Sequence, residues 1–441
     1  MRTARAIGRF LGGSSAASAI ANVALANGFV LCVNVLTGIV TARFLGPQGR
    51  GEFAAITLWP QLLGYAFALA LPSAVLYHAK KNPQRRRGIS AMGIALSTVA
   101  GILAVLTGEG LLPLLLLHAG PDVLRWARWM MVFAFPATVS TVLVALLQLQ
   151  EQFRLYNRLR YLPLVATLAA LLLLAMGRAL TPLTAALAYL LPGVFVFVWA
   201  AVWVARNIRP ERTDARRSLG PLMWYAARAY GGEAATTLMA QLDKVFLVNL
   251  LGAASFGVYV VVFNLSRVIT TLSSAISPVL LPKSAGRSAR DVMAMTARVL
   301  GVSTPLLLVP ALAFILTGGW LLRWLYGAEF TTGQWALNGL IIEAVVASVT
   351  NVITQPYLAL NRPGVVTVIQ GTSLPVLATA LGLLVPRWGI NGATVGLLLS
   401  TVYRAAATYV AYRLMLRVPA PRLWPDLQQS RELVRRLREA L

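Results

Sequence analysis

Long apolar segments alternate with short, polar and mostly basic ones along the whole chain. Each apolar segment holds the roughly 20 residues that a helix needs to cross a hydrocarbon core about 30 Å thick. The pattern therefore predicts twelve transmembrane helices. They are expected near residues 20–43, 54–78, 89–107, 126–149, 160–177, 181–205, 222–250, 254–281, 294–317, 334–360, 364–385 and 390–415.

The polar connections between these segments differ strongly in positive charge. On one side of the membrane they hold 26 Lys and Arg, and on the other they hold 7. Loops rich in Lys and Arg stay in the cytoplasm, so both termini are expected there. The first apolar run is longer than the 7–15-residue core of a signal peptide, which favours an uncleaved first helix. The seven basic residues of the outer side are Arg43, Arg50, Arg125, Arg128, Arg178, Arg323 and Arg387.

Composition agrees with an integral membrane protein and excludes several other classes. Hydrophobic residues make up 58% of the 441 and charged residues only 12%, about half the share of a soluble domain. The net charge of +25 follows from the cytoplasmic loops, and no soluble domain is present to bind nucleic acid. Cys32 is the only cysteine, and His78 and His118 belong to no ligand cluster, so no metal site is expected.

Two short segments repeat at almost the same distance. "LGPQGRGEF" (45–53) resembles "LGAASFGVY" (251–259), 206 residues later, and each follows the first helix of a six-helix group. "TPLTAALAYLL" and "WGINGATVGLLLS" form a weaker pair at an offset near 208. Because six is even, both groups enter from the cytoplasm, which predicts an all-α fold of two halves related by a pseudo-two-fold axis along the membrane normal. The glycines of the first segment are expected to form a tight turn.

These observations predict four parts of the chain. They are an N-terminal half (1–205), a cytoplasmic linker (206–221), a C-terminal half (222–416) and a basic cytoplasmic tail (417–441). The tail places apolar residues among arginines, as in a short amphipathic helix on the inner leaflet.

Six basic residues fall inside the apolar segments: Arg228, Lys244, Arg267, Arg298, Arg404 and Arg413. Arg298 and Arg413 are close enough to helix ends to extend to the interface. Arg267 and Arg404 lie near mid-depth, where an arginine costs at least about 2.5 kcal/mol and normally faces a partner or a cavity.

Other polar residues gather on the same helices and leave two interpretations open. They either pair with one another, for example Asp243 with Arg267 or Lys244, or line a hydrated, net-positive cavity between the halves. Carboxylates inside a membrane are natural sites of ion coupling, which makes Asp243, Glu233 and Glu343 candidates for that role. The cavity interpretation makes the following residues candidates for substrate binding: Arg267, Arg228, Lys244, Arg404, Asn27, Asn34 and Asn264.

Three stretches resemble a known family. "TARFLGPQGRGEFA", "QLDKVFLVNLLGAASFGVY" and "ISPVLLPKSAG" are similar to polysaccharide-precursor flippases, of O-antigen and exopolysaccharide type. These belong to the multidrug/oligosaccharidyl-lipid/polysaccharide exporter superfamily. The resemblance implies transport of undecaprenyl-pyrophosphate-linked oligosaccharide from the inner to the outer leaflet of the bacterial inner membrane. It also implies alternating access, a Na⁺ or H⁺ gradient in place of any other cofactor, and contacts with membrane lipid and other polysaccharide-assembly proteins.

Two alternatives remain. One is a cation-coupled multidrug exporter of the same fold, although such exporters commonly carry an acidic residue in the first helix, where this chain has none. Lipid II flippases of the superfamily generally have fourteen helices rather than twelve. The other alternative is a membrane glycosyltransferase or polymerase, but the longest outer loops offer few acidic or basic groups for catalysis. A transporter rather than an enzyme is therefore expected.

Overall fold

The computed structural model describes residues 14–68, 70–116, 120–208, 215–274, 288–360 and 362–416. Every regular element in these ranges is a helix. Two predicted features lie outside the described residues. They are the "ISPVLLPKSAG" stretch, within residues 275–287, and the predicted tail helix at 417–441.

The first helix, α2 (Ser14–Ala66), is interrupted at a single residue, Gly46, with φ 66° and ψ −179°. Glycine adopts a positive φ without the strain that a Cβ introduces. The predicted turn between the first two helices is thus confined to Gly46, and Gly49 and Gly51 lie in the helix that follows. A second break, where Ala70 has φ 56°, separates α2 from α3 (Leu71–Lys81).

Ten further α-helices complete the described chain. They are α4 (Arg86–Leu115), α5 (Pro121–Met130), α6 (Ala134–Leu149), α7 (Phe153–Met176), α8 (Pro182–Asn207), α9 (Ala215–Leu250), α10 (Ala253–Ser274), α12 (Ala289–Leu321), α13 (Gln334–Ala359) and α14 (Pro363–Ala411). Short 3₁₀ and π-helical turns join several of them. Like α2, α14 contains one non-helical residue, Gly389 with φ 55°, between two of the predicted segments.

Nine helical segments of the described residues are long and apolar enough to cross a membrane. The longest, Ala26–Lys81 and Pro363–Met415, are 56 and 53 residues long, far beyond the roughly 20 that one crossing requires. Each of them contains one of the glycine interruptions. The predicted all-α membrane architecture is confirmed.

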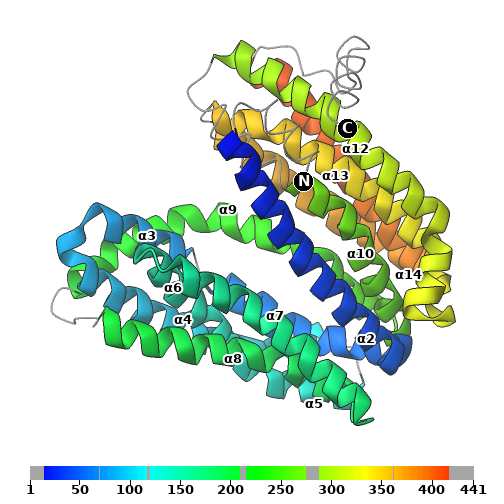
Figure 1. The fold of residues 1–441 in the computed structure, drawn as a ribbon, viewed down its shortest axis with the longest axis horizontal. Coiled ribbons are helices and arrows are strands. Elements are labelled where there is room, and N and C mark those ends of the chain that lie inside the picture. Colours follow the sequence, from blue (N-terminus) through cyan, green and yellow to red (C-terminus); the bar gives the residue numbers. More distant parts are fainter. Residues whose placement is uncertain are drawn as a thin grey trace. The chain divides into compact units, whose positions relative to one another are not determined.

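The chain forms two compact units, unit 1 (residues 1–35 and 261–441) and unit 2 (residues 36–260). In unit 2, α4, α6 and α8 lie side by side, and α9 packs across α3 and α4 (Figure 1). Leu222 and Ala226 of α9 enter the same buried core as Ala74 and Val142. The two units therefore do not coincide with the predicted halves, 1–205 and 222–416. The division into those halves stays a prediction.

In unit 1, α13 packs between α12 and α14. Its core includes two fully buried tyrosines, Tyr357 of α13 and Tyr412 at the end of α14, whose ring centroids are 4.9 Å apart. The Tyr357 hydroxyl donates to the Thr408 carbonyl at 2.8 Å, and the Tyr412 hydroxyl donates to the Ile353 carbonyl. The apolar rings thus fill the core while backbone carbonyls satisfy their hydroxyls.

The repeated segments at 45–53 and 251–259 touch each other within unit 2. The backbone at Gly51 closely approaches that of Ala253, and the backbone at Gly257 closely approaches that of Pro47. Pro47 and Ala253 are separated by the same 206 residues as Gly51 and Gly257, so the contact is reciprocal. This is the arrangement that a local two-fold axis produces.

Candidate functional site

A buried ion pair joins α10 and α13 in unit 1. Arg267 places a guanidinium nitrogen 2.8 Å from a carboxylate oxygen of Glu343. The Glu343 side chain is only 4% exposed, whereas that of Arg267 is 27% exposed. Phe263, one helical turn before Arg267, lies with its ring centroid 4.2 Å from the guanidinium carbon, so an aromatic face also contacts the cation.

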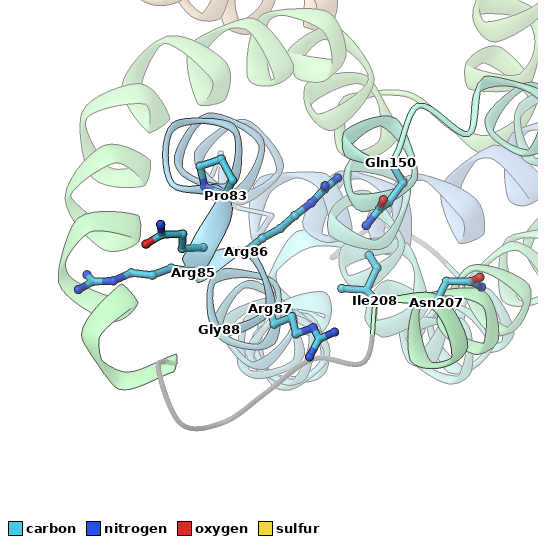
Figure 2. Close-up of a pocket in the computed structure, with 9 residues that line it drawn as sticks. Pro83, Arg85, Arg86, Arg87, Gly88, Gln150, Asn207 and Ile208 are labelled. Atoms are coloured by element: carbon cyan, nitrogen blue, oxygen red, sulfur yellow. The ribbon is translucent and has the colours of Figure 1, made fainter.

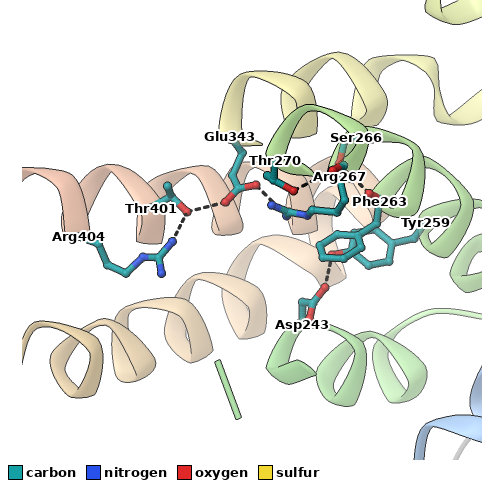
Figure 3. Close-up of polar contacts among 9 residues, drawn as sticks. All are labelled: Asp243, Tyr259, Phe263, Ser266, Arg267, Thr270, Glu343, Thr401 and Arg404. Carbon is teal, nitrogen blue, oxygen red and sulfur yellow. Dashed lines mark hydrogen bonds and ion pairs between the residues drawn. The ribbon is translucent and has the colours of Figure 1, made fainter. Parts of the chain in front are cut away.

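Two residues of α14 extend this pair into a network. The Thr401 hydroxyl donates to the other carboxylate oxygen of Glu343 at 2.7 Å, and Arg404 donates to the Thr401 hydroxyl at 3.4 Å. Figure 3 shows the guanidinium groups of Arg267 and Arg404 directed toward the Glu343 and Thr401 side chains from opposite sides. We call Arg267, Glu343, Thr401 and Arg404 the arginine cluster.

The arginine cluster contains two cations and one anion, so a positive charge remains after its internal pairing. An isolated charge in a low-dielectric interior is strongly unfavourable unless it meets a counter-charge or water. Arginine binds phosphate and carboxylate oxygens through its planar fork of N–H donors. The cluster can therefore hold an anionic group. It brings together three residues that the sequence analysis named as candidates, Arg267, Arg404 and Glu343.

A second buried carboxylate lies in unit 2. Asp243 of α9 is 2% exposed and accepts a hydrogen bond of 2.6 Å from the hydroxyl of Tyr259 in α10. Tyr259 is fully buried and was missed by the sequence analysis, because hydropathy patterns count tyrosine as part of an apolar helix face. Of the partners suggested for Asp243, Arg267 pairs with Glu343, and Lys244 donates a hydrogen bond to Gln241 at 2.9 Å.

The other candidates have different surroundings. Arg228 is exposed, with its guanidinium 5.6 Å from the ring centroid of Trp224. Asn34 and Asn264 are exposed on their helices, and Asn27 is half-buried. The side chain of Glu233 lies outside the described residues. In the parts of the chain that the structure describes, no three His, Cys, Asp or Glu side chains gather as they would around a metal ion.

Comparison with known proteins gives one family and a set of similar folds. The model of a family described as "Polysaccharide biosynthesis protein" matches residues 40–334. No curated protein sequence matches the chain.

Three solved structures illustrate the fold. The lipid II flippase MurJ in an inward closed conformation has a TM-score of 0.74 at 12% identity, covering 95% of this chain and 91% of that one. An inward-facing multidrug resistance MATE family transporter has a TM-score of 0.69 at 13% identity, covering 88% and 94%. The Vibrio cholerae MATE transporter VcmN in the bent form has a TM-score of 0.60 at 16% identity, covering 92% and 98%.

Proposed function

Because this chain belongs to the family of polysaccharide biosynthesis proteins, we propose that it is a flippase for undecaprenyl-pyrophosphate-linked oligosaccharide. It is a membrane transporter rather than an enzyme. In this proposal it turns the lipid-linked glycan from the inner to the outer leaflet of the bacterial inner membrane by alternating access. A Na⁺ or H⁺ gradient supplies the driving force.

The observation that carries the proposal is the excess positive charge of the arginine cluster. A pyrophosphate head group supplies the anion that Arg267 and Arg404 need, because Glu343 neutralises only one of them. The Arg267 side chain is 27% exposed and that of Glu343 only 4%, so Arg267 is the more accessible of the two. A cationic substrate would instead favour an excess of carboxylates at this position.

We further propose that the chain crosses the membrane twelve times, in two six-helix halves. The interruptions at Gly46 and Gly389 support this, because each lies between two apolar stretches that are long enough to cross separately. The reciprocal contact of Gly51 and Gly257 supports a pseudo-two-fold relation between the halves. Both termini lie in the cytoplasm in this arrangement, as the basic loops favour.

Asp243 and Glu343 are the proposed sites of ion coupling. A buried carboxylate can bind a proton or Na⁺ when its partner moves away, and both carboxylates have partners that a conformational change could displace. For Asp243 this partner is the Tyr259 hydroxyl, and for Glu343 it is Arg267.

A cation-coupled multidrug exporter is the second candidate function. The similarity in fold to MATE transporters and the buried Asp243 favour it. The two functions separate in a deletion strain. A flippase mutant accumulates lipid-linked oligosaccharide on the inner leaflet, whereas an exporter mutant becomes sensitive to cationic dyes and keeps normal glycan levels.

The decisive test uses charge-neutral variants of the arginine cluster. We expect Arg267→Gln to reduce flipping at least tenfold at normal expression in a complementation assay, with Arg298→Gln, an exposed arginine of α12, as the control. Arg267→Gln also leaves Glu343 without its cation, so the double variant Arg267→Gln/Glu343→Gln is needed. If the double variant restores flipping, the ion pair is structural only. Unchanged complementation by Arg267→Ala would remove Arg267 from the mechanism.

A further inference from the structure

A pocket of about 390 Å³ opens at one end of unit 2, where three helical connections meet. The turn between α3 and α4, residues 83–88, forms one wall, and Gln150 at the end of α6 forms another. Asn207 and Ile208 at the end of α8 complete it. The volume is within the range of sites that bind small molecules and head groups.

The lining of this pocket is strongly basic. It contains Arg85, Arg86 and Arg87, together with the amides of Gln84, Gln150 and Asn207, and none of the described lining residues is acidic. Figure 2 shows Arg86 extending toward Gln150 and Arg87 directed to the side of Asn207 and Ile208, while Arg85 extends in the opposite direction. Glu151 follows Gln150 in sequence but does not line the pocket.

The Arg86 guanidinium is hydrogen-bonded to the protein through only part of its N–H groups. One of its terminal nitrogens donates to the carbonyl of Leu149. Its Nε is buried and has no hydrogen-bond partner among the described residues. A buried donor without an acceptor costs free energy, so the contact with Leu149 leaves the hydrogen-bonding capacity of Arg86 incompletely used.

The position of the pocket indicates the source of an anion that would fit it. The helices α3, α6 and α8 end at Lys81, Leu149 and Asn207, next to the pocket. Apolar helices end where the hydrocarbon core gives way to lipid head groups. Basic pockets at this level recognise anionic head groups.

We propose that this pocket binds the phosphate-bearing head group of an anionic membrane lipid. Arg86 and Arg87 contact the phosphate, and the Gln150 and Asn207 amides bind its remaining oxygens or a glycerol hydroxyl. The site shares no residue with the arginine cluster and does not depend on the transported substrate. It ties unit 2 to anionic lipid at the membrane surface.

The test measures binding of phosphatidylglycerol to the purified full chain in detergent, with phosphatidylcholine as the neutral lipid. We expect phosphatidylglycerol to be retained and phosphatidylcholine to be lost. Arg87→Gln should weaken phosphatidylglycerol binding about fivefold, since one basic residue near a membrane surface contributes roughly that factor. Arg154→Gln, at another exposed arginine, in α7 and outside the pocket, should leave binding unchanged.

A second pair of variants separates lipid binding from folding. Gln150→Glu adds a negative charge inside the pocket without removing an arginine, and it should weaken binding at an unchanged melting temperature. Gln152→Glu, two residues later and outside the lining, is the matched control. Equal weakening by Arg87→Gln and Arg154→Gln, or by both glutamate variants, would show general surface attraction and overturn the site. Sodium pyrophosphate that binds as tightly as the lipid would overturn the lipid assignment in favour of a soluble phosphate.

Discussion

Gly51 of α2 and Gly257 of α10 lie where two backbone segments touch, and neither position has room for a side chain. A Cβ on Gly51 would lie 1.8 Å from the carbonyl oxygen of Ala253, and a Cβ on Gly257 would lie 1.9 Å from that of Pro47. Two residues related by the internal repeat thus make the same contact with each other's segment. The glycines of the first repeated segment, which the sequence predicted to form a tight turn, also allow two helices to approach closely.

We expect Gly51→Ala or Gly257→Ala to lower the free energy of unfolding by about 1–3 kcal/mol, because the new methyl group must displace a backbone segment. The measurement is thermal unfolding of the purified protein in detergent. Gly193→Ala in α8 is the control, since a Cβ there meets no atom within 4 Å. That control should be neutral, or stabilising by up to about 1 kcal/mol. Wild-type stability of both glycine variants would mean that the contact is not as close as described.

The hydrogen bond between Tyr259 and Asp243 gives a prediction about ion coupling. Asp243→Asn should abolish the dependence of transport on the Na⁺ or H⁺ gradient, because the amide cannot gain or lose the coupling charge. Tyr259→Phe removes one donor but keeps the carboxylate, so transport should remain gradient-dependent with a changed ion affinity. Flipping in proteoliposomes with imposed gradients measures both effects. If Asp243→Asn keeps full gradient dependence, Asp243 is a structural residue.

The buried tyrosines of unit 1 allow a prediction about stability alone. Tyr357→Phe deletes the hydroxyl that donates to the Thr408 carbonyl at 2.8 Å, and it should cost about 1 kcal/mol of unfolding free energy. Tyr403→Phe, at a side chain 36% exposed, should cost almost nothing. Thermal unfolding of the two variants side by side makes the comparison. A larger loss for Tyr403→Phe would contradict the packing described for α13 and α14.

The proposed twelve crossings can be tested by cysteine labelling, since Cys32→Ala removes the only native cysteine. In that background Gln48→Cys and Arg387→Cys should react with an impermeant maleimide from outside the cell. Gln84→Cys and Arg362→Cys should react only after the membrane is opened. Labelling of residues 362 and 387 from the same side would show that the stretch between them does not cross the membrane.

The resemblance to polysaccharide-precursor proteins was predicted from three short motifs, and the family match confirms it; the similar solved structures share the fold. The sequence also predicted that Arg267, Arg404 and Glu343 are functional candidates. A charged residue in an apolar segment costs free energy that a partner or a bound group must offset. The sequence could not predict that Glu343 is the partner of Arg267. That pairing depends on the rotation and depth of α10 relative to α13, and the pattern along a single helix sets neither.

Sequence alone determined the membrane class, the approximate helices and the charged residues that require partners, because helix length and the cost of burying charge are local properties. Tertiary structure decided which of those residues meet. It joined Asp243 to Tyr259, which hydropathy counts only as part of an apolar helix face, and it brought Arg86 and Arg87 of one connection together with Gln150 of another in one pocket. These contacts link residues of different helices or connections, so they depend on how the helices pack and not on the spacing of residues within any one of them.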